Sequence, residues 1–253
     1  MRHLFSHDGE SALAHTMQNS PLLAFDFDGT LTPIVPRPDD AILSTGVAAR
    51  LSTLASRLPV AIVTGRSVDD VRGRLGFEPQ FIIGNHGAEE QGALAGAVEA
   101  SAAFAELRLR LRERLAALSA AGVTVEDKGL SIALHYRLSR TREHALELIT
   151  DFLKDHDPAL RVFGGKLVVN VVPSLAPDKA DAVHALVRRS GASCALFAGD
   201  DVNDEPVFAT APAHWLTIRV GRDDPQSKAR YFLDSPSEMA LLLGRMVALL
   251  PAR

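Results

Sequence analysis

The sequence is poor in cysteine, in aromatic residues and in long apolar runs. Its 253 residues include one cysteine, Cys194, so no disulfide within the chain can hold the fold. The apolar stretch around Cys194 indicates a buried structural thiol rather than a nucleophile. The longest apolar stretch near the C-terminus, residues 239–250, is interrupted by Gly244 and Arg245 and is too short to span a bilayer.

An excess of charge of one sign is also missing. The formal net charge is −4 and the pI is about 6.1, so no overall basic field attracts nucleic acid or an anionic membrane. Charged residues follow Met1 at once, which excludes the apolar core of a signal peptide, and we expect a cytoplasmic location. With 47% hydrophobic and 23% charged residues, the composition is that of a soluble globular protein.

One stretch organises the rest of the chain. Residues 22–32 read Leu-Leu-Ala-Phe-Asp-Phe-Asp-Gly-Thr-Leu-Thr, which is typical of a strand buried on both faces of a parallel sheet and followed by a polar loop. Asp26 and Asp28 would then lie at the carboxyl end of the strand, where such sheets bind ligands. Two close carboxylates favour a hard divalent cation. The alternative is an ordinary Asp-Gly turn.

Three further apolar strands end in polar residues. Residues 59–63 lead into Thr64-Gly65-Arg66, and residues 81–83 into Gly84-Asn85-His86-Gly87-Ala88-Glu89. Residues 193–198 lead into Gly199-Asp200-Asp201-Val202-Asn203-Asp204-Glu205, which places four carboxylates within six residues. Alone, this acidic loop could be a solvated turn or an isolated cation site. Beside Asp26 and Asp28 it becomes the other half of a metal site, in a cleft shared by the strand ends.

The middle of the chain has a different pattern. An amphipathic helix over residues 104–118 has a basic face typical of solvated surface, and an expected hairpin joins residues 123–127 and 130–137. A helix over 141–155 and a hairpin of residues 160–163 and 166–172, turning at Gly164-Gly165, follow. This order predicts an inserted α+β domain with a four-stranded antiparallel sheet and two helices. We place it at residues 93–176, between core segments 1–92 and 177–253.

Several of these motifs together resemble one superfamily. Asp26-Phe27-Asp28-Gly29-Thr30, Thr64-Gly65-Arg66, Lys179 and Gly199-Asp200-Asp201-Val202-Asn203-Asp204 resemble the four ordered motifs of haloacid dehalogenase phosphatases. The segments 84–89, 126–137 and 165–173 further resemble trehalose-6-phosphate phosphatases. The resemblance runs from about residue 22 to residue 205. It implies an α/β fold, with a Rossmann-like parallel-sheet hydrolase core and the inserted domain acting as a cap.

The resemblance also implies roles for the core residues. Asp26 would attack phosphorus and form an aspartyl-phosphate, and Asp28 would be the general acid and base. Mg²⁺ would be held by Asp26, the Asp28 backbone carbonyl and Asp200, with Asp201 or Asp204 bound directly or through water. Thr64 and Lys179 would hold phosphoryl oxygens. Their alternatives are a strand-end cap for Thr64 and a solvated helix lysine for Lys179.

The remaining expected residues concern the sugar. The resemblance points to Asn85, His86, Glu126 and Lys128 as groups that hydrogen-bond sugar hydroxyls, and we count Arg66 and Asn170 with them as substrate-binding. His86 could instead be structural, and Glu126 with Lys128 could be a surface pair.

Asn170 stands where the family usually has glutamate, which bears on the choice of substrate. We therefore expect a small-molecule phosphosugar partner, trehalose 6-phosphate first. A phosphatase for another phosphosugar and a non-catalytic sugar-phosphate sensor are the alternatives.

Overall fold

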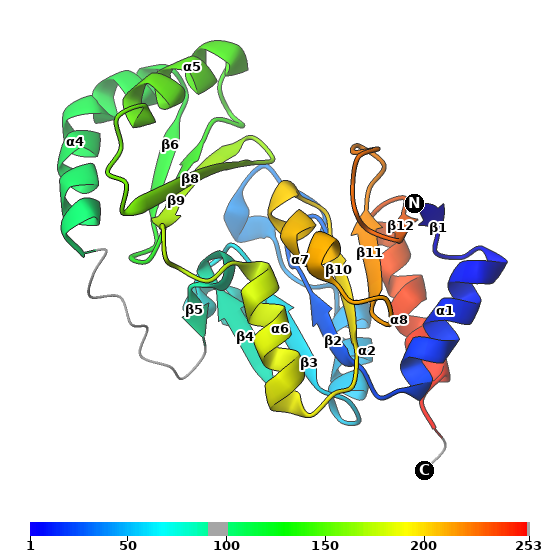
Figure 1. The fold of residues 1–253 in the computed structure, drawn as a ribbon. Coiled ribbons are helices and arrows are strands. Elements are labelled where there is room, and N and C mark those ends of the chain that lie inside the picture. Colours follow the sequence, from blue (N-terminus) through cyan, green and yellow to red (C-terminus); the bar gives the residue numbers. More distant parts are fainter. Residues whose placement is uncertain (91–100, 252–253) are drawn as a thin grey trace. The chain divides into compact units, whose positions relative to one another are not determined.

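A computed structural model describes residues 1–90 and 101–251 of the chain. The chain divides into two compact units, Met1–Gly92 with Pro177–Arg253 and Ala93–Ala176 (Figure 1). The first crossing between them, at residue 92, lies outside the described residues. Each unit has a hydrophobic cluster of its own and is described separately.

The first unit is built on a sheet that, within the described residues, has eight strands. Their order is β1, β12, β11, β10, β2, β3, β4, β5, and all neighbours are parallel except β4 and β5. The strands are β1 (Arg2–His3), β2 (Leu22–Phe25), β3 (Val60–Val63), β4 (Phe81–Gly84), β5 (Glu89–Glu90), β10 (Ala195–Gly199), β11 (Leu216–Val220) and β12 (Tyr231–Leu233). The strand order reverses around β2, which places its carboxyl end where ligands bind in sheets of this type.

Helices cover both faces of this sheet. Leu23 and Phe25 of β2 belong to one hydrophobic cluster, whereas Leu22 and Ala24 belong to the other. The first face is covered by α1 (His7–Gln18), α2 (Thr45–Ala55), α3 (Val68–Leu75) and α8 (Met239–Ala248). The second is covered by α6 (Lys179–Ser190) and α7 (Glu205–Thr210). Burial on both faces explains why the sequence of β2 is apolar without alternation.

The register of the central strands brings their polar exits together. Phe25 lies opposite Ala198 of β10 on one side and opposite Ile62 of β3 on the other. The first residues beyond the three strands are therefore neighbours. Helix α6 begins next to them, because Asp178 caps it by accepting a hydrogen bond from the backbone N–H of Asp181 at 2.9 Å.

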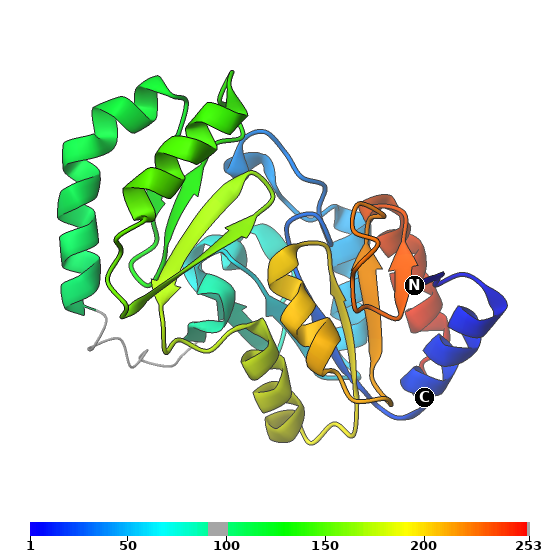
Figure 2. The ribbon, with the colours of Figure 1, turned by 45° about the horizontal axis from the view of Figure 1, so that its top comes forward.

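The second unit is a small α+β domain. Its antiparallel sheet has the order β6 (Thr124–Asp127), β7 (Ile132–His135), β9 (Val168–Pro173), β8 (Leu160–Gly165). Helices α4 (Ser101–Ala120) and α5 (Arg142–Leu153) lie together on one face (Figure 2), where they enclose alternate strand residues such as Ile132 and Leu134. Glu126, Ala133, His135 and Asn170 occupy the alternate positions on the other face. This arrangement confirms the predicted α/β class with a separate four-stranded antiparallel sheet.

The predicted turn of the second hairpin was wrong. Gly164 and Gly165 are paired in β8, opposite Val169 and Val168 of β9. The turn consists of Lys166 and Leu167, and Leu167 takes the left-handed conformation with φ +61°. The sequence prediction assigned the turn to the glycines because they adopt that conformation without strain, but the ladder continues through them.

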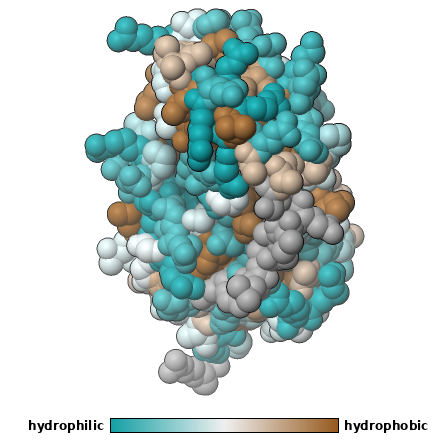
Figure 3. Space-filling view, turned by 90° about the vertical axis from the view of Figure 1, so that its left-hand side faces the viewer, coloured by the Kyte–Doolittle hydropathy of each residue, from teal (hydrophilic) through white to brown (hydrophobic). Residues whose placement is uncertain are grey.

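The basic face of α4 is more than solvated surface. Arg108 binds the Asp127 carboxylate through two hydrogen bonds of 2.6 and 3.0 Å, and Arg110 donates to the Phe152 carbonyl at 2.8 Å. Hydrophilic residues predominate on the face drawn in Figure 3, where apolar ones form small separate groups. Within the described residues, no helix is both long and apolar enough to cross a membrane.

Candidate active site

The loop after β2 meets the loop after β10 in the first unit. Gly29 has φ +84°, and a Cβ atom there would lie 2.1 Å from the Asp200 carboxylate oxygen Oδ2. Any side chain at this position would therefore force the loops apart, which explains the Asp-Gly pair better than an ordinary turn does. The Thr30 hydroxyl donates to Asp200 Oδ1 at 3.3 Å and ties the two loops together.

Three carboxylates converge where these loops meet. One oxygen each of Asp26, Asp200 and Asp204 lies within 4.8 Å of the others, and all three residues are buried, with exposed fractions of 5%, 1% and 0%. The structure thus brings together Asp26 and the acidic loop, which are about 170 residues apart in the chain. An arrangement of this kind can hold a metal ion with oxygen ligands.

Lys179 lies between two of these carboxylates. Its Nζ donates to Asp26 Oδ1 at 2.8 Å and to Asp204 Oδ1 at 2.7 Å, and the side chain is 2% exposed. Burial opposes the charged amine, but the charges of Asp204 and Asp26 outweigh it and raise the pKa of Lys179. Lys179 is therefore a buried cation next to Asp26, and not a solvated helix lysine.

At Asp26, in contrast, burial is not outweighed by the neighbouring charges. Burial raises the pKa of its carboxyl well above the ordinary value, and the charges of Asp204 and Asp200 raise it further, although Lys179 opposes them. Three carboxylates and one ammonium leave two negative charges in excess when all are ionised. A divalent cation would balance this charge, so the residues present fit Mg²⁺.

The oxygens of Asp204 already have protein partners. Oδ2 accepts the backbone N–H groups of Asp200 and Asp201 at 2.9 and 3.0 Å, and Oδ1 accepts from Lys179. Asp201 lies farther out, where its side chain accepts from the backbone N–H of Val202 at 2.8 Å. This pattern favours Asp204 as the residue that shapes the loop and holds Lys179.

Asp28 is paired with Arg66. Arg66 Nε donates to Asp28 Oδ2 at 2.6 Å and Nη2 donates to Oδ1 at 2.8 Å, and a second carboxylate, Asp70, accepts from Nη1 at 2.7 Å. Burial lowers the pKa of Arg66, but the two carboxylates outweigh it and raise the pKa. Sequence reasoning missed Asp70, although its spacing of four from Arg66 at the start of a helix is a usable signal.

The loops after β3 and β4 are joined by backbone hydrogen bonds. Asn85 N donates to the Arg66 carbonyl at 2.7 Å, and His86 N donates to the Thr64 carbonyl at 3.0 Å. Asn85 and His86 both have positive φ, +48° and +60°, a strained conformation that is often retained at functional sites. A Cβ atom at Gly65 would lie 2.4 Å from His86 Cε1, so the bare backbone at Gly65 is needed for the ring to pack there.

Glu89 is a second residue that sequence reasoning left without a role. Its Oε2 accepts from Asn85 Nδ2 at 2.6 Å and from the backbone N–H of Val68 at 3.0 Å. Glu89 therefore orients the Asn85 amide and holds the start of α3.

Two of the expected sugar-binding residues of the second unit, Glu126 and Asn170, share the face of its sheet opposite the helices, and Lys128 follows β6. Glu126 Oε2 lies 2.9 Å from His135 Nε2 and 3.5 Å from Lys128 Nζ. Burial raises the pKa of Glu126, but the His135 hydrogen bond and the Lys128 charge outweigh it and lower the pKa. Asn170, in the same face, is 3% exposed, and within the described residues its Nδ2 has no hydrogen-bond partner. His135 was not among the predicted site residues.

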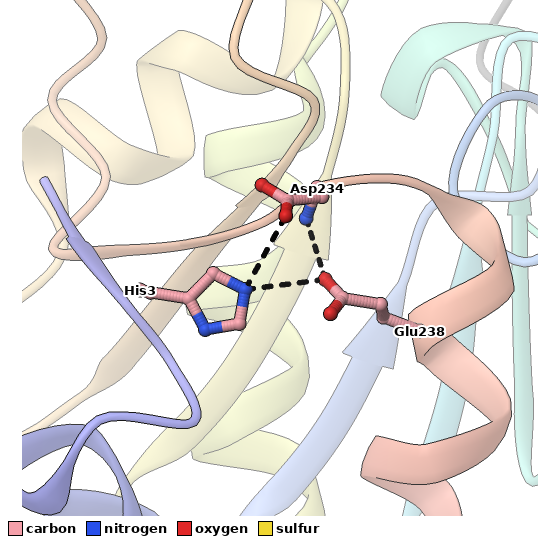
Figure 4. A group of neighbouring side chains, drawn as sticks. All are labelled: His3, Asp234 and Glu238. Atoms are coloured by element: carbon pink, nitrogen blue, oxygen red, sulfur yellow. Dashed lines mark hydrogen bonds and ion pairs between the residues drawn. The ribbon is translucent and has the colours of Figure 1, made fainter.

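A second group of histidine and carboxylate side chains lies at the β1 edge of the sheet of the first unit. His3 Nε2 lies 3.3 Å from Glu238 Oε2 and 3.9 Å from Asp234 Oδ2 (Figure 4). His3 Nδ1 accepts from the backbone N–H of Phe5 at 3.2 Å, which places the proton of a neutral ring on Nε2. A metal at Nε2 would move that proton to Nδ1, against the Phe5 N–H. The group therefore ties β1 to the start of α8.

Comparison with known proteins identifies the family of the chain. A sequence model of the family described as trehalose-phosphatase matches residues 24–237. The chain belongs to the trehalose-phosphatase family. The matched region contains Asp26, Thr64, Lys179 and Asp200 as well as the whole second unit.

Individual relatives and structures extend the comparison. A trehalose-phosphate phosphatase of Mycolicibacterium paratuberculosis is 35% identical over 244 residues, which are 89% of this chain and 62% of that protein. The chain thus spans less than two thirds of this curated relative. The C-terminal domain of a C. albicans trehalose-6-phosphate phosphatase has a TM-score of 0.79 at 21% identity, covering 94% of this chain and 96% of that one. A haloacid dehalogenase-like hydrolase from B. subtilis has a TM-score of 0.64 at 16% identity, covering 91% and 99%. These two structures show the haloacid dehalogenase-like fold.

Proposed function

We propose that this chain is a magnesium-dependent phosphatase that hydrolyses trehalose 6-phosphate to trehalose and phosphate. The observation that carries the proposal is the buried cluster in which Lys179 bridges Asp26 and Asp204 at the end of the central strands. A structural salt bridge alone would not need three buried carboxylates around one amine, since unpaired buried charge is destabilising. Membership of the trehalose-phosphatase family supports the reaction type and the substrate.

The reaction proceeds in two displacements. A carboxylate oxygen of Asp26 attacks phosphorus, the bond between phosphorus and the sugar oxygen breaks, and Asp28 gives a proton to that oxygen. Asp28 then takes a proton from water as the water oxygen attacks the phosphorus of the aspartyl-phosphate. The second displacement breaks the bond between phosphorus and Asp26 and releases phosphate. Dividing the hydrolysis in this way replaces one difficult step by two easier ones.

The other core residues hold the phosphoryl group. Lys179, already within hydrogen-bond distance of Asp26, supplies positive charge where the phosphate must approach, and Thr64 supplies a hydroxyl at the end of β3. Asp26, the Asp28 carbonyl and Asp200 would hold Mg²⁺, with Asp204 orienting them. When bound, Mg²⁺ neutralises phosphate charge and lets the anionic nucleophile approach.

The second unit acts as the cap that recognises the sugar. Glu126 of β6 and Lys128, which follows that strand, offer charged hydrogen-bonding groups, and Asn170 of β9 offers an amide. Asn85 and His86 supply further polar groups from the core. Because Asn170 carries no charge where the family usually has glutamate, a different phosphosugar is the alternative substrate.

A phosphate-release assay over a panel of phosphosugars with Mg²⁺ tests the proposal. We expect trehalose 6-phosphate to have the highest kcat/KM, and Asp26→Asn, checked for folding by circular dichroism, to be inactive. A preference for another phosphosugar that is lost in Asn170→Glu would make Asn170 a specificity residue and reject trehalose. Absence of hydrolysis for every phosphosugar and for an aryl phosphate would favour a non-catalytic sensor.

Sugar recognition by the cap is tested separately. Loss of one hydrogen bond to a charged group costs about 1.5–3 kcal/mol, so Glu126→Ala should lower kcat/KM for trehalose 6-phosphate about ten- to a hundredfold. Hydrolysis of 4-nitrophenyl phosphate, which lacks the sugar, should be unchanged. The exposed Glu147→Ala of the same unit is the matched control. Equal losses on both substrates would exclude a sugar-binding role for Glu126.

A further inference from the structure

The Arg66 side chain is committed to Asp28. Two parallel hydrogen bonds, 2.6 Å from Nε and 2.8 Å from Nη2, engage both carboxylate oxygens of Asp28. A planar guanidinium that binds a carboxylate in this way fixes its orientation as well as its position. The sequence predicted substrate binding by Arg66, and in the structure its guanidinium contacts the carboxylates of Asp28 and Asp70.

Arg66 is itself held on its other side. Nη1 donates to Asp70 Oδ2 at 2.7 Å, and Nη2 donates to the Pro38 carbonyl at 2.9 Å. The Arg66 side chain is 10% exposed, and its guanidinium carbon lies 5.5 Å from the centre of the Phe27 ring. Four hydrogen bonds therefore fix Arg66 between helix α3, the loop that contains Pro38, and Asp28. A side chain held from three directions can transmit a fixed geometry to the group that it binds.

We propose that Arg66 is a positioning residue that holds the Asp28 carboxylate in its working orientation for proton transfer. The inference rests on the proposed function, in which Asp28 protonates the departing sugar oxygen. A proton can pass only to an atom within hydrogen-bond distance, whereas an unbound aspartate side chain samples several rotamers. The hydrogen bonds from Arg66 restrict Asp28 to one rotamer, and the hydrogen bond to Asp70 in turn fixes the Arg66 side chain.

The dependence of the rate on the leaving group tests this role. A good leaving group such as 4-nitrophenolate departs without a proton, but a sugar alkoxide needs one. We expect Arg66→Gln to lower kcat/KM about a hundredfold for the phosphosugar and less than about threefold for 4-nitrophenyl phosphate. Across a series of aryl phosphates, log kcat/KM should fall more steeply with leaving-group pKa in the variant than in the wild type.

Matched variants separate positioning from general damage. Arg74→Gln removes another arginine that binds Asp70 and the Pro38 carbonyl but makes no contact with Asp28, so its slope should equal that of the wild type. Arg66→Lys keeps the charge without the bidentate fork and should recover only part of the loss. Asp70→Asn weakens the hold on Arg66 and should slightly steepen the dependence of log kcat/KM on leaving-group pKa. The exposed Asp69→Asn should leave this dependence unchanged.

The alternative is that Arg66 binds the phosphate group of the substrate. Competitive inhibition by inorganic phosphate distinguishes this role from positioning of Asp28. If Arg66 positions Asp28, the inhibition constant of phosphate should be the same in Arg66→Gln and in the wild type. Weaker phosphate inhibition with equal losses for all substrates would overturn the inference and make Arg66 a phosphate ligand. An unchanged slope in a folded, active Arg66→Gln would also overturn it. A wild type that hydrolyses no phosphate ester would instead reject the proposed function.

Discussion

At the scale of single residues, the site combines charges that are unfavourable for folding. Asp26 is buried beside two other carboxylates, and its pKa is raised mainly by burial. Lys179 offsets part of the repulsion, and the charges of Asp204 and Asp26 raise its own pKa despite burial, which favours the charged amine. Such a site stores free energy that is released when a cation or a substrate provides the missing interactions.

The first prediction at this scale concerns Asp26 and stability. A carboxyl whose pKa is raised in the folded state stabilises the fold below its unfolded pKa and loses that contribution as pH rises through the folded pKa. In EDTA, the wild type should therefore lose stability from acidic to neutral pH relative to Asp26→Asn, which has no charge to bury. Asp26→Asn should have the higher Tm at neutral pH, with the difference shrinking in acid.

Thermal unfolding of the two proteins at both pH values provides the measurement. Lys179 keeps Asp204 as a partner in Asp26→Asn, so the substitution does not leave the amine unpaired. The exposed Asp69→Asn controls for the general loss of a negative charge. A lower Tm of Asp26→Asn than of the wild type at neutral pH would contradict the prediction.

At the scale of elements, the site depends on how closely the strand-end loops approach each other. The loops after β3 and β4 are joined by two backbone hydrogen bonds, and Gly65 leaves room for the His86 ring. The left-handed backbone at Asn85 and His86 is held by hydrogen bonds to the carbonyls of Arg66 and Thr64 in the loop after β3. The two loops are therefore coupled, and we expect a substitution in one loop to displace the other.

A pair of glycine substitutions tests this coupling. At Gly65, a Cβ would lie 2.4 to 3.0 Å from three His86 ring atoms, so Gly65→Ala should destabilise the fold by about 1–3 kcal/mol and lower kcat/KM. At Gly73, inside α3, a Cβ would meet nothing within 4 Å, so Gly73→Ala should stabilise the fold by about 0.5–1 kcal/mol with unchanged activity. Urea unfolding and phosphate release measure both effects. Equal stability of the two variants would contradict the coupling.

At the scale of the whole molecule, the residues expected to transfer the phosphoryl group and those expected to bind the sugar lie mainly in different units. The first unit contains the carboxylates, Lys179 and Arg66, and the second contains Glu126, Lys128 and Asn170. Each unit has its own hydrophobic cluster. Substitutions in one unit should therefore leave the packing of the other intact, because distant sites contribute additively to stability.

Metal binding should be visible in the stability of the whole protein. A ligand present at about 100 times its dissociation constant stabilises the native state by about 2.7 kcal/mol, which for a chain of this size raises Tm by several degrees. Mg²⁺ should produce such a shift in the wild type, and EDTA should reverse it and abolish activity.

Two variants show whether the shift arises at the proposed site. Asp200→Asn should lose the Mg²⁺ shift, and the exposed Asp69→Asn should keep it. Calorimetric scans with and without Mg²⁺ measure both. Activity that survives exhaustive EDTA treatment, or an undiminished shift in Asp200→Asn, would reject the metal site.

Much of this protein could be predicted from its sequence because the informative patterns are local. The unbroken apolar stretches that end in Asp26, Thr64 and Gly199 predicted a parallel sheet with a site at one edge, and the alternating segments predicted the antiparallel sheet. The fold class and the family were confirmed. The second hairpin turn was placed wrongly, since the ladder through Gly164 and Gly165 outweighs their preference for turns.

Only the tertiary structure decided which charged groups are partners. Nothing in the sequence indicates that Arg66 binds Asp28, that Lys179 bridges Asp26 and Asp204, or that His135 lies against Glu126. Local sequence determines where a strand ends and which polar residues follow. Side-chain pairing depends on strand order, register and the direction of each side chain, and these are set by the packing of residues far apart in the chain.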